Sequence, residues 1–185
     1  MEVKDFGILS TPQLHFLVRA ANEGGNFTEQ QYFDTLVAGY QSVMAGGNNA
    51  NTVRSDGKAL VIDAANGVGA LKVKALQDSL SNVLTFDKRN DGSTGELNTK
   101  VGADFVEKQQ LAPQGFDSKE LLGRRCVSLD GDADRLVFFY FRNEDGKEEP
   151  AMRLLDGNKI AALAASFINE KLNALMKCGV AKDAT

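Results

Sequence analysis

The sequence has few of the features that would place a protein in a membrane, in a secretory pathway or on nucleic acid. No apolar run approaches the roughly 20 residues that a membrane-spanning helix needs, and the charged start at residues 1–5 is unlike a signal peptide. Two cysteines are too few for a disulfide framework or a zinc site. The 25 acidic residues outnumber the 21 basic ones, which gives no electrostatic reason to bind a polyanion. We therefore expect a cytoplasmic protein with free thiols that binds neither membranes nor nucleic acid.

The length of 185 residues suits one well-packed α/β domain with an appendage, and we expect three parts along the chain. Residues 1–24 would hold the last strand of a preceding domain, an apolar segment that begins at Phe6 and is stopped by Pro12, followed by a connection. Residues 25–56 would hold a helix and a linker rich in Gly, Asn and Ser. Residues 57–185 would form the core domain.

Within the core domain, apolar runs of strand length alternate with segments of helical periodicity. Strands are predicted at 59–63, 83–86, 125–129 and 136–141, and helices at 68–80, 103–109 and 156–176. This order indicates an α/β fold with a mixed, mostly parallel sheet of about four strands sandwiched between helices. Because ligands gather at the carboxyl ends of strands in such sheets, the loops at 65–69 and 130–134 should lie at the same edge.

The acidic run from Asp130 to Arg135 directly follows the third predicted strand, with an aspartate at every second position. Because the residues between the aspartates are only Gly and Ala, the backbone can curl until the carboxylates of Asp130, Asp132 and Asp134 converge. Carboxylates that close raise one another's pKa, and a hard cation such as Mg²⁺, which prefers oxygen ligands, relieves this repulsion. We therefore predict a divalent-cation site with these three aspartates as ligands and Arg135 beside it as an anion-binding group.

The same run is compatible with other kinds of loop. An Asp-Gly pair also marks turns between strands, although a turn does not need the third aspartate. An EF-hand would need Gly in place of Arg135 and Glu in place of Phe141, so the letters exclude it. A phosphatase of the haloacid dehalogenase type would use Asp130 as its nucleophile and usually has Thr or Val in place of Asp134. That alternative is weaker but stays open.

The acidic run after an apolar strand resembles the metal-binding loop of the α-D-phosphohexomutase superfamily. Further segments narrow the resemblance from the superfamily to one of its families. These segments are Ser10–His15, Asp63–Ala70, Asn90–Gly92, Leu97–Asn98, Gly102–Val106 and Leu155–Ala161. Together they resemble the eukaryotic phosphoacetylglucosamine mutases over nearly the whole chain. The resemblance covers the second of that family's four domains and the last strand of the first.

This resemblance implies the metal-binding domain of an enzyme that interconverts N-acetylglucosamine 6-phosphate and 1-phosphate through a phosphoserine and a bisphosphate intermediate, in the biosynthesis of UDP-N-acetylglucosamine. It implies one Mg²⁺ held by Asp130, Asp132 and Asp134, with Arg135 contacting the phosphate. The full-length form is expected to be a monomer. No segment resembles the family's serine, sugar-binding or phosphate-binding loops, so we expect this chain to be inactive alone.

Two alternatives concern the function as a whole. The substrate could be another hexose phosphate, derived from glucosamine, glucose or mannose, because the loops that read the sugar are missing from this sequence. The chain could also be a non-catalytic Mg²⁺-binding module. Ser10 and Ser128 lack both a histidine base and the family's loop, so neither is a candidate nucleophile.

Two further segments have both a functional and a structural interpretation. Residues 66–69 could present backbone amides to an anion, or could form only a tight turn. Arg89, Asn90 and Asn98 could border a substrate cleft, or could simply be solvated loop residues.

Overall fold

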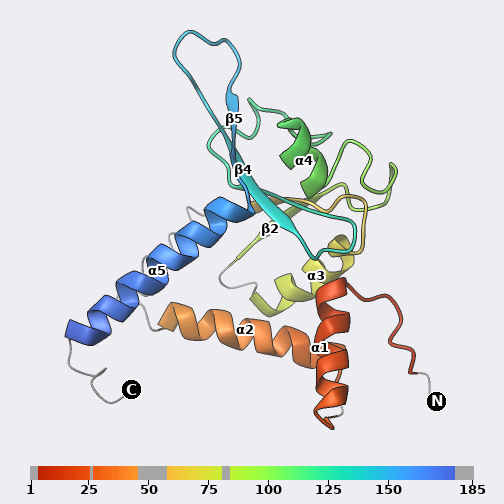
Figure 1. Cartoon of the computed structure of the whole chain (residues 1–185). Coiled ribbons are helices and arrows are strands. Elements are labelled where there is room, and N and C mark those ends of the chain that lie inside the picture. The colour runs from red at the N-terminus through yellow and green to blue at the C-terminus, as the bar shows by residue number, and fades with distance from the viewer. Residues whose placement is uncertain (1–3, 26, 46–57, 81–83, 178–185) are drawn as a thin grey trace. The chain divides into compact units, whose positions relative to one another are not determined.

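The structure, a computed structural model that describes residues 4–25, 27–45, 58–80 and 84–177, contains a five-stranded sheet (Figure 1). The strands are β1 (Leu60–Asp63), β2 (Phe86–Arg89), β3 (Cys126–Leu129), β4 (Leu136–Arg142) and β5 (Ala151–Leu155). They are arranged in the order β2-β1-β3-β4-β5. Strand β1 pairs in parallel with β2 and β3, whereas β3 and β4 are antiparallel. The predicted mixed sheet is confirmed, with one strand more than expected among the described residues.

Five helices are described, namely α1 (Thr11–Asn22), α2 (Glu29–Ala45), α3 (Gly69–Leu80), α4 (Ala103–Gln109) and α5 (Gly157–Lys177). Those of the predicted core domain, α3 to α5, begin and end close to the predicted residues. The helices predicted at 68–80, 103–109 and 156–176 are thus confirmed. The linker predicted after α2 lies outside the described residues.

The face of the sheet that α4 covers holds the main hydrophobic core. Val61 of β1 and Cys126 of β3 are paired neighbours on this face, and Ala103 and Val106 of α4 belong to the same cluster. The other buried members are Phe116, Leu121, Val137, Phe139 and Phe141. This packing gives β1 and β3 fixed positions, so the loops that follow them start from a rigid base.

The opposite face of the sheet is covered as well. Ile62 and Val127 are paired on this face and are both buried. At the start of α3, Gly69 lies so close to Leu129 that an added Cβ would be 2.8 Å from its side chain. Helices therefore lie against both faces, as predicted for an α/β domain.

Cys126 is a free thiol, as expected. Its burial in the core raises the pKa of the thiol to about 12, so it remains protonated near neutral pH. The second cysteine, Cys178, lies outside the described residues.

The two strands at the sheet edges were predicted incorrectly. The strand expected at 83–86 is found at Phe86–Arg89, and β5 was not predicted. An edge strand has a neighbour on one side only and tolerates charged residues, whereas the prediction followed runs of apolar letters. Strand β2 contains three charged residues and β5 has an arginine at its centre.

The strand predicted near Phe6 is also wrong, because residues 6–10 form no strand and helix α1 begins at Thr11. Pro12 was taken as the end of a strand, but it occupies the first turn of the helix, where its missing N–H costs nothing. The Ser10 backbone N–H donates to the side chain of Gln13 at 2.9 Å, in the manner of a capping box. The same letters therefore start a helix.

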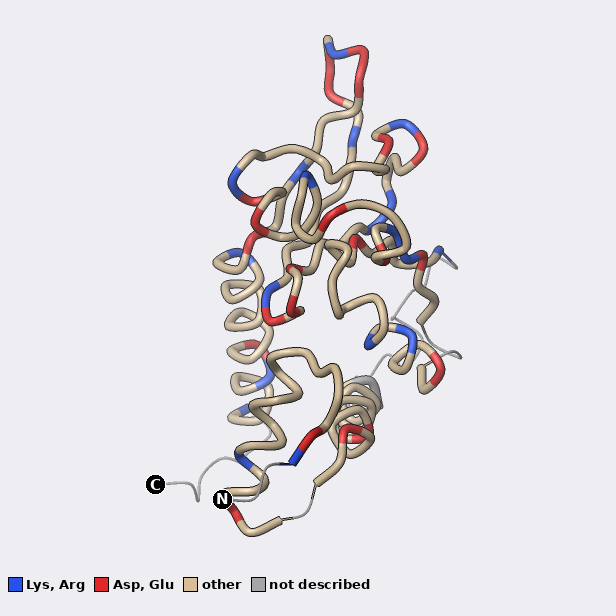
Figure 2. Tube along the Cα trace, turned by 90° about the vertical axis from the view of Figure 1, so that its right-hand side faces the viewer, with Lys and Arg blue, Asp and Glu red and all other residues tan. Residues whose placement is uncertain are grey.

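The chain divides into two compact units, residues 1–154 and residues 155–185. The second contains α5, which carries the apolar residues that the helical spacing predicted. No helix among the described residues is long and apolar enough to cross a bilayer. Figure 2 shows basic and acidic residues interspersed along the described trace.

Candidate metal centre

The acidic run, residues 130–135, connects the antiparallel strands β3 and β4, whose terminal residues Leu129 and Leu136 are paired. The interpretation as a turn between strands therefore describes the connection correctly. Ala133 adopts the left-handed backbone conformation with a φ of 57°, which is uncommon for a residue with a Cβ. This conformation bends the loop between its second and third aspartates.

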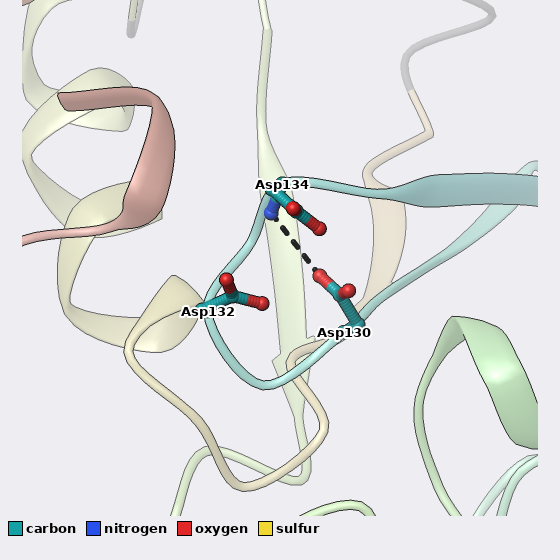
Figure 3. A group of neighbouring side chains, drawn as sticks. All are labelled: Asp130, Asp132 and Asp134. Atoms are coloured by element: carbon teal, nitrogen blue, oxygen red, sulfur yellow. Dashed lines mark hydrogen bonds between the residues drawn. The ribbon is translucent and has the colours of Figure 1, made fainter. Parts of the chain in front are cut away.

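The loop brings together the three aspartates that the spacing predicted. One carboxylate oxygen from each of Asp130, Asp132 and Asp134 lies within 4.8 Å of the other two. Figure 3 shows the three side chains turned toward the inside of the loop. The connection between β3 and β4 is thus also a cluster of oxygen ligands.

This set of donors fits a hard divalent cation. Mg²⁺ and Ca²⁺ bind oxygen at roughly 2.0–2.6 Å, so one ion can bridge oxygens about 4–5 Å apart. Asp130 is buried, whereas Asp132 and Asp134 are exposed. The exposed pair can therefore close onto an ion held by the buried carboxylate, with room left for water or a phosphate oxygen.

The three carboxylates differ in their affinity for protons. Burial alone would raise the pKa of Asp130, but hydrogen bonds from the backbone and guanidinium of Arg135 and from Asp134 outweigh it, and the pKa is lowered. Asp134 has a raised pKa, chiefly through its hydrogen-bonded contact with Asp130, then through slight desolvation and the negative charges of Asp130 and Asp132. Repulsion between the carboxylates therefore raises the pKa of Asp134 and not that of Asp130. A bound cation would relieve this repulsion.

Arg135 forms an ion pair with Asp130, the buried aspartate of the loop. Its Nε donates to Asp130 Oδ2 at 2.8 Å, and its Nη1 donates to Asp104 at the start of α4. Asp134 Oδ1 lies 3.5 Å from the same Nε. These contacts, first with Asp130 and then with Asp104, raise the pKa of Arg135, so its positive charge beside the loop is permanent.

Asp63, at the carboxyl end of β1, joins the segments around the metal loop. It is fully buried, and its Oδ1 accepts hydrogen bonds from the backbone N–H of Ala65 at 3.1 Å and from Asn90 Nδ2 at 2.8 Å. Its Oδ2 accepts from the backbone N–H of Gly102 at 2.7 Å and from the hydroxyl of Ser128, which precedes the acidic run. All four partners are donors, as a buried carboxylate requires.

The loops after β1 and β3 lie at the same sheet edge, as predicted, and touch each other through glycines. A Cβ on Gly67 would lie 2.3 Å from the carbonyl oxygen of Gly131. The N–H of Val68 donates to that same carbonyl at 3.0 Å. The amides of Asn66 and Gly67 donate to other carbonyls of the chain, which favours the tight turn over an anion site.

The polar residues expected either at a cleft or in solvent have structural partners. Arg89 pairs with Glu120 at 2.5 Å and with Asp87 at 3.2 Å. The N–H of Asn98 donates to the carbonyl of Ala65 at 3.0 Å, which ties two loops together. Through these contacts Arg89 and Asn98 help to hold the loops together.

Three residues that shape the centre were not found from the sequence. Asp63 carried a signal, since it is a charged residue at the end of an otherwise apolar strand. Asp104 lies in a segment of the family resemblance, but nothing in the sequence indicated its contact with Arg135, 31 positions away. Thr11 also lies in such a segment, and its hydroxyl donates to Asp132 Oδ2 at 2.6 Å across 121 positions, a contact that the sequence did not indicate.

Comparison with known proteins identifies the family. The family model described as phosphoacetylglucosamine mutase AMG1, domain II, matches residues 23–137, a span that contains the acidic run. The chain belongs to the phosphoacetylglucosamine mutase family. Membership of this family leaves the haloacid dehalogenase interpretation of Asp130 without support, and the sequence-based resemblance is confirmed.

Curated relatives of the family align along most of the chain. The phosphoacetylglucosamine mutase of Arabidopsis thaliana is 46% identical over 172 residues, which cover 92% of this chain and 30% of the relative. The human phosphoacetylglucosamine mutase is 40% identical over 171 residues, covering 91% of this chain and 30% of the relative. The chain therefore spans about a third of the length of the curated relatives it matches.

Solved structures of the family have the same fold. The Aspergillus fumigatus N-acetylphosphoglucosamine mutase, crystallised with GlcNAc-6P and magnesium, superposes with a TM-score of 0.74 at 38% identity, covering 91% of this chain and 33% of that one. An N-acetylglucosamine-phosphate mutase in its product complex, described as a member of the α-D-phosphohexomutase superfamily, gives a TM-score of 0.78 at 32% identity. That match covers 93% of this chain and 31% of the other.

Proposed function

We propose that this chain is the metal-binding domain of a cytoplasmic enzyme that interconverts N-acetylglucosamine 6-phosphate and N-acetylglucosamine 1-phosphate. The observation that carries the proposal is the convergence of three carboxylates, within 4.8 Å of one another, at the end of β3 in a chain of this mutase family. The presence of GlcNAc-6P and magnesium in the crystals of the A. fumigatus relative supports the choice of substrate and ion. In the proposed arrangement, residues 57–185 form the metal-binding domain, residues 25–56 lead into it, and residues 1–24 connect to a preceding domain.

In this proposal Asp130, Asp132 and Asp134 hold one Mg²⁺. The ion would neutralise charge on the oxygens of a phosphoryl group, which is the main help that phosphoryl transfer needs from a protein. Arg135 would supply a second positive charge to the same phosphate, and its contacts with Asp104 and Asp130, which keep its guanidinium beside the aspartates, support this role. The remaining components of the reaction, among them the phosphoserine implied by the resemblance, would come from other parts of the complete enzyme.

The metal centre can be tested on this chain with Mn²⁺, a paramagnetic ion that accepts the same oxygen ligands as Mg²⁺. Free Mn²⁺ is measured by electron paramagnetic resonance while protein is added. Asp132→Ala should weaken binding at least about tenfold, because it removes one of three charged ligands. The matched control is Asp78→Ala, which removes an exposed aspartate from α3 and should leave the affinity unchanged. Equal affinity in the wild-type chain and the Asp132→Ala variant would refute the site.

The assignment to the mutase reaction can be tested in a chimera. The segment of the Arabidopsis enzyme that aligns with this chain is replaced by the chain itself, and conversion of GlcNAc-6P to GlcNAc-1P is followed by phosphorus NMR. We expect the chimera to be active and its Asp132→Ala variant to be inactive. A folded chimera that binds Mn²⁺ but converts only another hexose phosphate would contradict the substrate.

A further inference from the structure

Thr11, the first residue of α1, makes two contacts with the middle aspartate of the metal loop. Its hydroxyl donates to Asp132 Oδ2 at 2.6 Å, and its backbone N–H donates to the Asp132 carbonyl at 3.1 Å. In Figure 3 the red ribbon of α1 lies on the same side of the loop as Asp132. A residue from the start of the chain therefore holds both the backbone and the carboxylate of one predicted ligand.

The three aspartates need this kind of support to different degrees. Asp130 is buried and receives hydrogen bonds from Arg135 and from the backbone N–H of Asp134. Asp132 is exposed, so its side chain would sample several rotamers if nothing held it. The hydroxyl of Thr11 occupies one carboxylate oxygen and leaves the other to the cation. Partners of this kind orient metal ligands in many proteins.

Thr11 is itself held in place by a cluster of polar residues beneath it. The side chain of Gln13, fully buried, accepts a hydrogen bond from the N–H of Ser10 at 2.9 Å and donates to Glu29 Oε1 of α2 at 2.9 Å. Lys72 of α3 binds the same Glu29 oxygen at 2.6 Å. The start of α1 is thereby joined to α2 and α3, so the hydroxyl reaches the loop from a fixed position.

We propose that Thr11 is a positioning residue of the metal centre, whose hydroxyl fixes the Asp132 carboxylate for the cation. The proposal rests on the metal centre proposed above. It extends the centre beyond residues 23–137, the span that the family model matches, to a residue of α1. It also gives the Thr11 hydroxyl a chemical task that helix capping does not require, since Ser10 and Gln13 form the capping box of α1.

The test compares Thr11→Val with Thr11→Ser in the 185-residue chain. Valine keeps the shape of threonine but removes the hydroxyl, whereas serine keeps the hydroxyl. By the size of such effects at other metal sites, Thr11→Val should weaken Mn²⁺ binding about tenfold and Thr11→Ser should bind like the wild type. Thr35→Val is the matched control, because it removes an exposed hydroxyl that bonds only to the α2 backbone, and its affinity should be unchanged.

A structural role is separated from a positioning role by repeating the substitution in the Asp132→Asn background. There Thr11→Val should cause no further loss of Mn²⁺ affinity, because the carboxylate that it orients has been neutralised. The urea midpoint of the metal-free Thr11→Val protein should match the wild type, since its backbone bond to the loop remains.

Wild-type affinity in Thr11→Val, or an equal loss in the Asp132→Asn background, would overturn the role of Thr11 while leaving the metal centre intact. If Thr11→Val also lowers the urea midpoint, the Mn²⁺ affinities in the two backgrounds still decide. An equal loss of affinity in both backgrounds overturns the role, and a loss in the wild-type background alone supports it. If the wild-type chain binds no Mn²⁺, the metal centre fails and the role of Thr11 fails with it.

Discussion

Asp63 shows how a fully buried residue outside the acidic run can decide the shape of the centre. It accepts four hydrogen bonds, and their donors come from the loop after β1, the segment after β2, the turn before α4 and strand β3. A fully buried carboxylate is costly unless it is paired in this way. The cost is offset because one side chain joins four segments of the chain.

Asp63→Asn is therefore expected to lower the free energy of unfolding by about 3 kcal/mol. The amide has almost the same shape, but its NH₂ group would face donors and leave buried hydrogen bonds unmade, at roughly 1–3 kcal/mol each. Urea denaturation measures the change. Asp117→Asn is the control, because Asp117 also accepts two backbone N–H bonds but is exposed, and it should cost under about 1 kcal/mol. Equal losses in the two variants would contradict the role of Asp63.

The sequence predicted the residues whose partners are local and missed those whose partners are distant. Asp130, Asp132 and Asp134 stand at every second position of one loop, so their spacing alone indicates convergence. Asp63 reaches Ser128 across 65 positions, and Thr11 reaches Asp132 across 121. Only the fold brings such pairs together, because the local sequence does not indicate which distant residue will be the partner.

At the scale of elements, the loops after β1 and β3 are in van der Waals contact only because glycines face each other. Adding a Cβ to Gly67 would force the backbone of Gly131 away by more than side-chain adjustment can absorb, since the nearest atoms are backbone. Gly67→Ala should therefore lower the free energy of unfolding by at least about 2 kcal/mol and weaken Mn²⁺ binding, because the metal loop must move. Urea denaturation and the Mn²⁺ titration measure the two effects.

Gly39→Ala is the matched control for that substitution. Gly39 lies in α2, and a Cβ there meets nothing within 4 Å. Alanine has a higher helix propensity than glycine, so this variant should gain roughly 0.5–1 kcal/mol. A loss of stability at both positions would mean that the contact between the loops is not what makes Gly67 necessary.

Elements that bury an apolar face were predictable, and elements at the edges were not. Helix α3 carries helical periodicity, and strands β1, β3 and β4 are largely apolar runs of strand length. Strand β2 is an edge strand that pairs through its backbone while carrying Asp87, Lys88 and Arg89, so apolar content was a poor guide to it. In α1 the capping residues Ser10 and Gln13 favour a helix, whereas the apolar residues alone suggested a strand.

At the scale of the whole molecule, the chain covers about a third of the relatives that it matches. We expect no interconversion of GlcNAc-6P and GlcNAc-1P by these 185 residues alone, measured by phosphorus NMR in excess Mg²⁺, a diamagnetic ion. The two serines considered from the sequence support this expectation. Ser128 is fully buried with its hydroxyl donated to Asp63, and Ser10 is 5% exposed. Turnover by the chain alone would contradict the proposed division of labour within the complete enzyme.

The distant contacts around the metal loop also have a kinetic consequence. Contacts that join residues 65 and 121 positions apart carry a larger loop-closure cost than local contacts, so we expect the support of the ligand cluster to form late in folding. A cation that recognises the closed cluster stabilises the native state and leaves the folding transition state almost untouched. Mn²⁺ should thus slow unfolding in stopped-flow experiments while the refolding rate stays nearly constant. The ion would thus prolong the lifetime of the folded state without accelerating its formation.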